Sequence, residues 1–358
     1  MSAHEILIWI MGIFAVLGAV DRILGNRFGI GKDFEEGILA MGSLAMAMIG
    51  VITLAPVLAA VLKPVVVPVY SLLGADGAMF AGTILACDMG GGALAAEMAG
   101  SREAALLGGV ITGSMLGATL VFTVPVAMGI LREEDRPAMA RGILCGIVTV
   151  PVGVLVGGVV AGFEIGMVLR NLIPIVLIGG VIAFGLWRSE EKMIRMFAAF
   201  GKGVVVLITA GLAAAILEEL TGLALIPGMA PIEEGFQTVG AIAIVLAGAF
   251  PLVAIVTKVL KKPLLRLGKA LGINDVAAAG LVASLANSIA TFGLVKEMDN
   301  RGKVVNIAFA VSAAFVFGDH LGFTAGFAPE MLPAMIIGKL AGGVSAVFVA
   351  LWLTKKEG

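Results

Sequence analysis

Ala86-Cys87-Asp88-Met89-Gly90 and Leu285-Ala286-Asn287-Ser288-Ile289 are polar breaks in two otherwise apolar runs of this chain. They hold matching places in two stretches, about 198 residues apart, that look like diverged copies of one another. Short strings shared by both copies anchor the match: Glu35-Glu36-Gly37 and Glu233-Glu234-Gly235, Lys63-Pro64 and Lys262-Pro263, Leu73-Gly74 and Leu271-Gly272, Glu97-Met98 and Glu297-Met298. A duplication with a broken apolar segment at its centre is typical of secondary transporters.

The composition indicates the solvent of this chain. Of 358 residues, 60% are hydrophobic and 14% are charged, and the mean hydropathy is +1.09. Soluble domains carry about 25% charged residues, so lipid is the natural solvent for this many apolar side chains. The 50 glycines suit the close packing of membrane helices. The net charge of −1 says nothing about nucleic acid, but no basic patch interleaves aromatic residues, so we expect no nucleic-acid partner.

The apolar residues group into eleven segments, most of them near the roughly 20 residues that a spanning helix needs. The segments fall at 5–24, 38–61, 78–97, 104–130, 141–162, 167–187, 203–220, 236–258, 276–296, 304–327 and 331–353. No stretch alternates with period two over the length of a barrel strand, so the sequence predicts an all-α polytopic membrane protein in the lipid bilayer. We interpret the first segment as a retained transmembrane helix, because Asp21-Arg22 follows it instead of a small-residue cleavage site.

Basic loop residues favour nine spanning helices over eleven. If every segment crosses, the basic loops at 132–141 and 188–202 lie on the opposite side from the basic loop at 22–32. If segments 78–97 and 276–296, which contain the polar breaks, re-enter on the side they came from, every strongly basic loop lies inside. We therefore predict nine spanning helices and two re-entrant or broken segments.

The same count orients the two copies. Five crossings then separate the start of the first segment from the start of the seventh, and an odd number gives the copies opposite orientations. The chain is predicted to contain two five-segment inverted repeats, at residues 1–162 and 203–358, joined by a linking helix within 163–202. The N-terminus is expected outside and the C-terminus inside.

Asp88 lies in the first polar break, two residues before Gly90-Gly91-Gly92. Glycines hold a helix poorly, and the backbone groups freed by a break in lipid must face protein or a water-filled cavity. A carboxylate inside a membrane is costly unless it is paired or serves a ligand. We interpret Asp88 as a cation-binding residue, and the alternative is a cap for the half-helix that follows.

Asn287 and Ser288 hold the equivalent place in the second copy. Their side chains offer neutral donors and acceptors that suit a hydroxyl group, an amine or a broken helix end. Both are favoured helix caps, so a structural role is equally open.

The string Gly318-Asp319-His320-Leu321-Gly322 interrupts segment 304–327. An Asp–His pair in an apolar helix is rare, which suggests a cation site coupled to protons, since histidine titrates near neutral pH. The alternative is a structural pair with Lys339. Phe323, one of five phenylalanines in this segment, is a candidate cation–π partner, with plain packing as its alternative.

Other classes of protein fit the sequence less well. Two intramembrane aspartates suit an aspartyl protease, but its accompanying motifs are missing and it leaves the duplication unexplained. No phosphate-binding loop of the type G-x-x-x-x-G-K-[ST] is present. Cys87 and Cys145 lack the spacing of a metal site or a disulfide. We expect no metal, no cofactor and no enzymatic activity.

Several strings resemble the ethanolamine utilisation permease family of bacteria over nearly the whole chain. They are Phe34-Glu35-Glu36-Gly37, Leu54-Ala55-Pro56-Val57-Leu58, Ala81-Gly82-Thr83-Ile84-Leu85-Ala86-Cys87-Asp88-Met89-Gly90-Gly91, Asp299-Asn300-Arg301-Gly302-Lys303, Val311-Ser312-Ala313-Ala314-Phe315 and Gly318-Asp319-His320-Leu321-Gly322-Phe323. The resemblance implies facilitated uptake of ethanolamine through the bacterial cytoplasmic (inner) membrane, to supply ammonia-lyase chemistry in the cytosol.

The residues suggest how such a substrate is bound. Ethanolamine is a small ammonium ion at neutral pH, so Asp88 and Asp319 are expected to contact its charge, with Asn287 and Ser288 at its hydroxyl and His320 as a proton relay. The sequence predicts a carrier that works by alternating access. A Na⁺- or H⁺-type cation exchanger, a passive channel and a sensor of small amines are the alternatives. Whether the carrier forms a homo-oligomer is left open.

Overall fold

The structure is a computed structural model that describes residues 2–355, without the side chains of 260–262, 264, 265, 267 and 269. Lys262 of the repeat anchors and residues 1 and 356–358 of the predicted repeats therefore lie outside the described part. Every regular element within that part is a helix, as the sequence predicts. The first half contains α1 (Ala3–Ile23), α2 (Gly31–Leu72), α3 (Ala78–Ile84), η1 (Cys87–Gly91), α4 (Gly92–Met98), α5 (Arg102–Leu106), η2 (Leu107–Gly117), η3 (Thr119–Thr123), α6 (Val124–Ile130), η4 (Glu133–Asp135), α7 (Arg136–Ile147) and α8 (Val150–Val160). The second half contains α9 (Ile165–Thr221), α10 (Ile232–Leu271), α11 (Asp275–Ala286), α12 (Ser288–Leu294), η5 (Val295–Glu297), α13 (Asn300–Ala313), α14 (Asp319–Phe327), η6 (Pro329–Met331) and α15 (Leu332–Leu353).

Seven stretches of the described chain are long and apolar enough to cross a membrane. They are Ala3–Ile23, Gly31–Leu72, Arg102–Ile130, Glu133–Val160, Ile165–Thr221, Ile232–Val259 and Pro329–Leu353. The longest, α9, contains two of the predicted segments, 167–187 and 203–220, and bends at Ser189, which has non-helical backbone angles. The chain is thus a multi-pass helical membrane protein. The count of nine crossings stays a prediction.

The three predicted segments missing from these stretches are each divided into shorter helices. The first break, residues 85–91, separates α3 from α4. The second break is Asn287, whose extended backbone separates α11 from α12. The third break, residues 314–318, separates α13 from α14. The polar strings of the sequence therefore do interrupt helices. Whether 78–97 and 276–296 re-enter the membrane stays a prediction.

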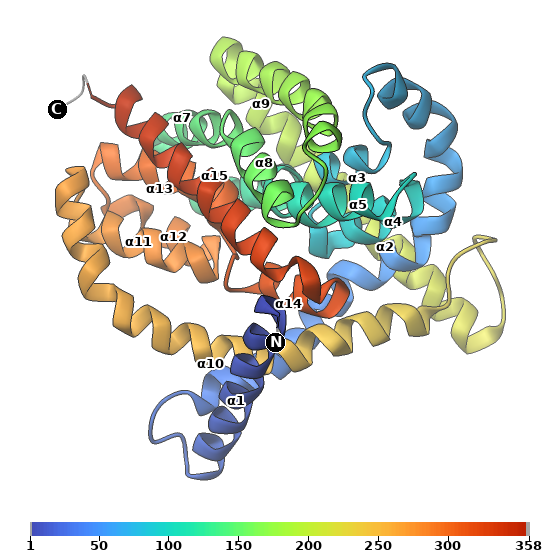
Figure 1. The fold of residues 1–358 in the computed structure, drawn as a ribbon, viewed down its shortest axis with the longest axis horizontal. Coiled ribbons are helices and arrows are strands. Elements are labelled where there is room, and N and C mark those ends of the chain that lie inside the picture. Colours follow the sequence, from blue (N-terminus) through green and yellow to red (C-terminus); the bar gives the residue numbers. More distant parts are fainter. Residues whose placement is uncertain (1, 356–358) are drawn as a thin grey trace.

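The long helices α2 and α10 pack against one another. They have 42 and 40 residues, so each is about 60 Å long against a hydrocarbon core of roughly 30 Å. Both contain internal prolines, which remove a backbone hydrogen bond and bend a helix. Figure 1 shows α10 as a curved ribbon that crosses α1 and passes beside α14, with α11 and α13 on its inner side.

At two helix crossings, α2 with α9 and α10 with α1, a glycine allows the two backbones to come into contact. A Cβ atom on Gly50 of α2 would lie 1.9 Å from the carbonyl oxygen of Ile208 in α9. A Cβ atom on Gly248 of α10 would lie 2.0 Å from the carbonyl oxygen of Met11 in α1. Neither separation is compatible with a side chain, so these glycines set how closely the helices approach.

Candidate functional site

The third break is held against the end of α11 by backbone hydrogen bonds. The Phe315 N–H donates to the Ser284 carbonyl over 3.1 Å, and the Phe317 N–H donates to the Leu285 carbonyl over 2.9 Å. Non-helical backbone at membrane depth needs such partners, because lipid offers none. This pairing fixes the start of α14, and with it the two residues that follow the break, Asp319 and His320.

The first and third breaks line one cavity of about 150 Å³. Asp88 enters it from the first break, and Asp319 and His320 enter it from the first turn of α14. A water molecule takes about 30 Å³ of liquid volume, so the cavity has room for a small molecule. Apolar side chains and Ser43 make up the rest of its lining: Leu44, Ala47, Ala86, Met89, Ala118, Phe122 and Phe315.

The two carboxylates in this cavity can each accept further hydrogen bonds. Within the described residues, neither has a lysine or arginine nitrogen within 4.0 Å, and Asp319 has no hydrogen bond from another side chain. The Asp88 Oδ1 is 3.7 Å from His320 Nε2 and 4.0 Å from Cys87 Sγ. No side chain caps the helical turn that starts at Cys87, so the Asp88 carboxylate is not used as a helix cap there. Carboxylates placed in this way suit a cationic ligand.

Behind the cavity, His320 is joined to a lysine. Lys339 of α15 is 1% exposed, and its Nζ donates to the Ser114 carbonyl and lies 3.0 Å from His320 Nδ1. This is the structural pair that the sequence suggests, and the same imidazole also faces Asp88. His320 therefore lines the cavity, and its contact with Lys339 is also part of the packing of α14 on α15.

An aromatic corner closes another side of the cavity. The Phe315 ring is 5.5 Å from the Phe122 ring, edge to face, and 5.2 Å from the His320 ring. Phe315 has a φ of +62°, a conformation that a bulky residue rarely adopts and that often marks a functional site. Sequence reasoning misses Phe122, because it lies in η3, far along the chain from the polar strings, and only the fold brings its ring to Phe315.

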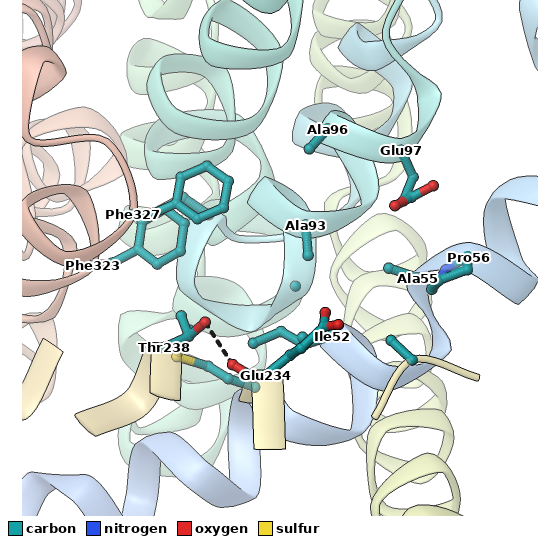
Figure 2. Close-up of a pocket in the computed structure, with 14 residues that line it drawn as sticks. Ile52, Ala55, Pro56, Ala93, Ala96, Glu97, Glu234, Thr238, Phe323 and Phe327 are labelled. Carbon is teal, nitrogen blue, oxygen red and sulfur yellow. Dashed lines mark hydrogen bonds between the residues drawn. The ribbon is translucent and has the colours of Figure 1, made fainter. Parts of the chain in front are cut away.

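A second cavity of about 210 Å³ lies on the other side of the first break. Figure 2 shows Phe323 and Phe327 of α14 on one side of it, Glu97 across from them, and Glu234 beside Thr238 of α10. The two phenylalanine rings are stacked with centroids 5.0 Å apart. Phe323 thus lies with Cys87 and Gly90 in this second cavity and not in the cavity of Asp88.

Asn287 and Ser288 lie at the second break and line neither of these two cavities. The Asn287 side chain caps α12, accepting from the Ile289 N–H over 2.7 Å. The Ser288 hydroxyl is buried, and no described residue forms a hydrogen bond with it. The structure therefore groups Asp88, Asp319 and His320, and the other three predicted residues do not line the cavity of this group.

The cluster also contains donors that suit a metal. Cys87 Sγ, the Asp88 carboxylate and a ring nitrogen of His320 lie within 4.8 Å of one another, and thiolate, imidazole and carboxylate together suit a thiophilic divalent ion. Such an ion would face the ammonium group of Lys339 across the same imidazole ring. This repulsion favours a monovalent cation in the cavity.

Comparisons with known proteins identify the family of this chain. The family described as "Ethanolamine utilisation protein, EutH" matches residues 3–353. This chain belongs to the EutH family. It is 59% identical to a probable ethanolamine permease EutH of Listeria monocytogenes serotype 1/2a (strain 10403S), an alignment that covers 99% of this chain and 95% of the relative.

Other relatives are covered over a similar length. The chain is 48% identical to a probable ethanolamine permease EutH of Escherichia coli (strain K12), over 100% of this chain and 97% of the relative. It is 54% identical to a Bacillus subtilis (strain 168) protein named YxeR, over 100% of this chain and 96% of that protein. No solved structure gives a significant match. The family resemblance expected from the sequence is confirmed.

Proposed function

We propose that this chain takes up protonated ethanolamine across the bacterial cytoplasmic membrane by alternating access. One observation carries the proposal: Asp88 and Asp319 face the same small, otherwise mostly apolar cavity, without a lysine or arginine within 4.0 Å among the described residues. Two carboxylates without a close ion-pair partner are costly in a membrane protein unless they are protonated or a cation joins them. The names of the relatives indicate which cation.

The cavity offers complementary surfaces to both ends of such a ligand. The ammonium group would lie between Asp88 and Asp319, where charge-assisted hydrogen bonds are strongest. The rings of Phe122 and Phe315 line the same cavity and would supply apolar contact and cation–π attraction. The two methylene groups of ethanolamine would rest on the alanine and leucine side chains.

A two-fold relation between the repeats supports the alternating-access proposal. Contacts between the copies occur in reciprocal pairs. Where a residue of the first copy contacts a residue of the second, the two equivalent residues, 197 or 198 positions away along the chain, contact each other as well. The pairs are Gly37 with Ala247 and Gly235 with Ile49, and Gly50 with Ile208 and Gly248 with Met11. Reciprocal contacts of this kind are what a two-fold axis between two similar units produces.

The charges of the loops indicate how that axis is oriented relative to the membrane. With the basic loops inside, the axis lies in the membrane plane, the repeats are inverted, the N-terminus is outside and the C-terminus is inside. The cavity with Glu97 and Glu234 would then open outward, and the first break would separate it from the cavity with Asp88. We retain residues 1–162 and 203–358 as the repeats and 163–202 as the link between them.

The remaining predicted residues have proposed roles in other steps of the cycle. Phe323 lines the outer cavity and would contact the amine before it passes the first break. Asn287 and Ser288 would contact the hydroxyl in a state in which the second break moves toward the substrate. His320 would contact the substrate beside Asp88.

Uptake of labelled ethanolamine into proteoliposomes tests the proposal. Saturable uptake together with counterflow is the expected result. Flux that does not saturate would indicate a channel, and binding without flux would indicate a sensor. Ion flux driven by a Na⁺ or H⁺ gradient without ethanolamine would indicate a cation exchanger. Each of these three results contradicts the proposed carrier.

A further inference from the structure

Lys339 is a buried lysine that contacts no carboxylate among the described residues. Its Nζ donates to the Ser114 carbonyl and approaches His320 Nδ1 at 3.0 Å, and no Asp or Glu oxygen of the described residues lies within 4.0 Å of it. A lysine inside a membrane protein is costly, and a carbonyl with one neutral ring nitrogen is a modest compensation. Packing alone does not explain why a lysine stands at this position.

A protonated Lys339 would assign the proton of the neutral His320 ring to one of its two nitrogens. An ammonium group has donors and no acceptor, so the ring nitrogen that faces it must accept. Because Nδ1 accepts, the proton of the neutral ring is on Nε2, and this is the nitrogen that faces Asp88 and the cavity. Lys339 thus makes His320 a hydrogen-bond donor toward the cavity.

This donor has no full partner within the protein. His320 Nε2 is 3.7 Å from Asp88 Oδ1, which is longer than a hydrogen bond. The other polar groups of the cavity are carboxylates, which accept, and the hydroxyl of Ser43, which donates to the Ala40 carbonyl over 2.9 Å. An ammonium group gives the carboxylates their donors and leaves the Nε2–H in need of an acceptor.

We propose that His320, held by Lys339 with its proton on Nε2, donates to the hydroxyl oxygen of the substrate and thereby selects amino alcohols over simple alkylamines. The proposal rests on the proposed uptake of protonated ethanolamine and deepens it. His320 contacts the substrate, and Lys339 is a positioning residue that acts through the ring. The hydroxyl of the substrate is thus recognised in the cavity of Asp88, which Asn287 and Ser288 do not line.

Competition between two amines of equal size tests this proposal. The size-matched probe is n-propylamine, which has a methyl group where ethanolamine has its hydroxyl. In wild-type proteoliposomes we expect n-propylamine to inhibit labelled ethanolamine uptake at least about tenfold more weakly than unlabelled ethanolamine does, the effect of one lost hydrogen bond. The ratio of the two inhibition constants is the readout.

Four variants distinguish an effect of the His320 Nε2–H donor from an effect of side-chain packing. In His320→Gln an amide nitrogen takes the place of Nε2, and the ratio should stay within about threefold of wild type, whereas His320→Asn should bring it near one. Lys339→Arg, which keeps a charged donor, should preserve the ratio, and Lys339→Met should reduce it about tenfold while ethanolamine is still bound. If Lys339→Met does not fold, the two His320 variants still decide the question.

Two results would overturn the proposal. One is a wild-type ratio in both His320→Asn and Lys339→Met. The other is loss of the ratio in Asn287→Ala with retention in His320→Asn, which would place the hydroxyl at the second break. Calorimetric measurement of amine binding to the purified protein shows whether only the His320 proposal fails or the proposed function fails as well. Equal binding of both amines rejects the hydroxyl contact alone, and binding of neither rejects the proposed substrate as well.

Discussion

At the scale of single residues, Asp88 and Asp319 differ from Asp135 in what faces them. Asp135 is 1% exposed, and its carboxylate lies 2.6 Å from Lys303 Nζ, so its charge is balanced within the protein. Asp88 and Asp319 face a cavity instead. We expect Asp88→Asn and Asp319→Asn each to abolish ethanolamine uptake, because an amide cannot neutralise an ammonium group. The apparent affinity should fall at least about tenfold, the effect of a lost charged hydrogen bond.

Asp135→Asn is the matched control for this prediction. Breaking a buried ion pair destabilises a protein by roughly 3–5 kcal/mol, so this variant should melt at a lower temperature. Its KM for ethanolamine should stay at the wild-type value, since Asp135 lines neither cavity. Uptake kinetics and thermal melting in detergent measure the two effects. Normal uptake by both Asp88→Asn and Asp319→Asn would reject the site.

At the scale of helices, the close crossings that involve α2 and α10 depend on equivalent glycines in the two repeats. An alanine at Gly50 or Gly248 would press its Cβ against a backbone carbonyl of the neighbouring helix. We expect each substitution to destabilise the protein by about 1–3 kcal/mol, the usual effect of overpacking, and to lower its melting temperature.

The chain contains the control for this prediction at another pair of equivalent positions. Gly42 and Gly240 lie in the same two helices, and a Cβ on either would meet no atom within 4 Å. Alanine there should be neutral or stabilising by about 0.5–1 kcal/mol, because glycine weakens a helix. Equal melting temperatures for Gly50→Ala and Gly42→Ala would show that the crossings do not depend on close approach.

The helices also show how far the sequence leads. Hydropathy and the polar strings at 86–90, 285–289 and 318–322 predict helices interrupted at the places where the structure interrupts them. They also predict two segments, 167–187 and 203–220, and α9 bends between them at Ser189. They do not predict that the charged residues after the bend are helical, because these residues look like a loop in the sequence. The grouping of Asp319 with Asp88 follows from the third break pairing with α11, a contact between backbones that carries no residue signature.

At the scale of the whole molecule, a carrier for the ammonium form matters most where the lipid leak is smallest. Alkylammonium groups such as that of lysine titrate near about pH 10, so the neutral base that crosses lipid becomes about tenfold scarcer with each pH unit below that. We expect the ratio of uptake by proteoliposomes to leak into protein-free liposomes to rise as the assay goes from about pH 8 to about pH 6. A constant ratio would mean that the protein carries the neutral base.

The orientation of the two repeats can be tested by the side of the membrane on which equivalent helices begin. Glu103 and Asn300 stand at the start of equivalent helices, 197 positions apart, and both are exposed. The reciprocal contacts fit a two-fold axis, but an axis along the membrane normal would place these residues on one side and an axis in the membrane plane would place them on opposite sides. Loop charges favour the second case, so Glu103→Cys in intact cells should react with a membrane-impermeant thiol reagent. Asn300→Cys should react only after permeabilisation. The native Cys87 and Cys145 are buried, which keeps the background low. Labelling of both positions from one side would make the repeats parallel and would remove the structural support for alternating access by inverted repeats.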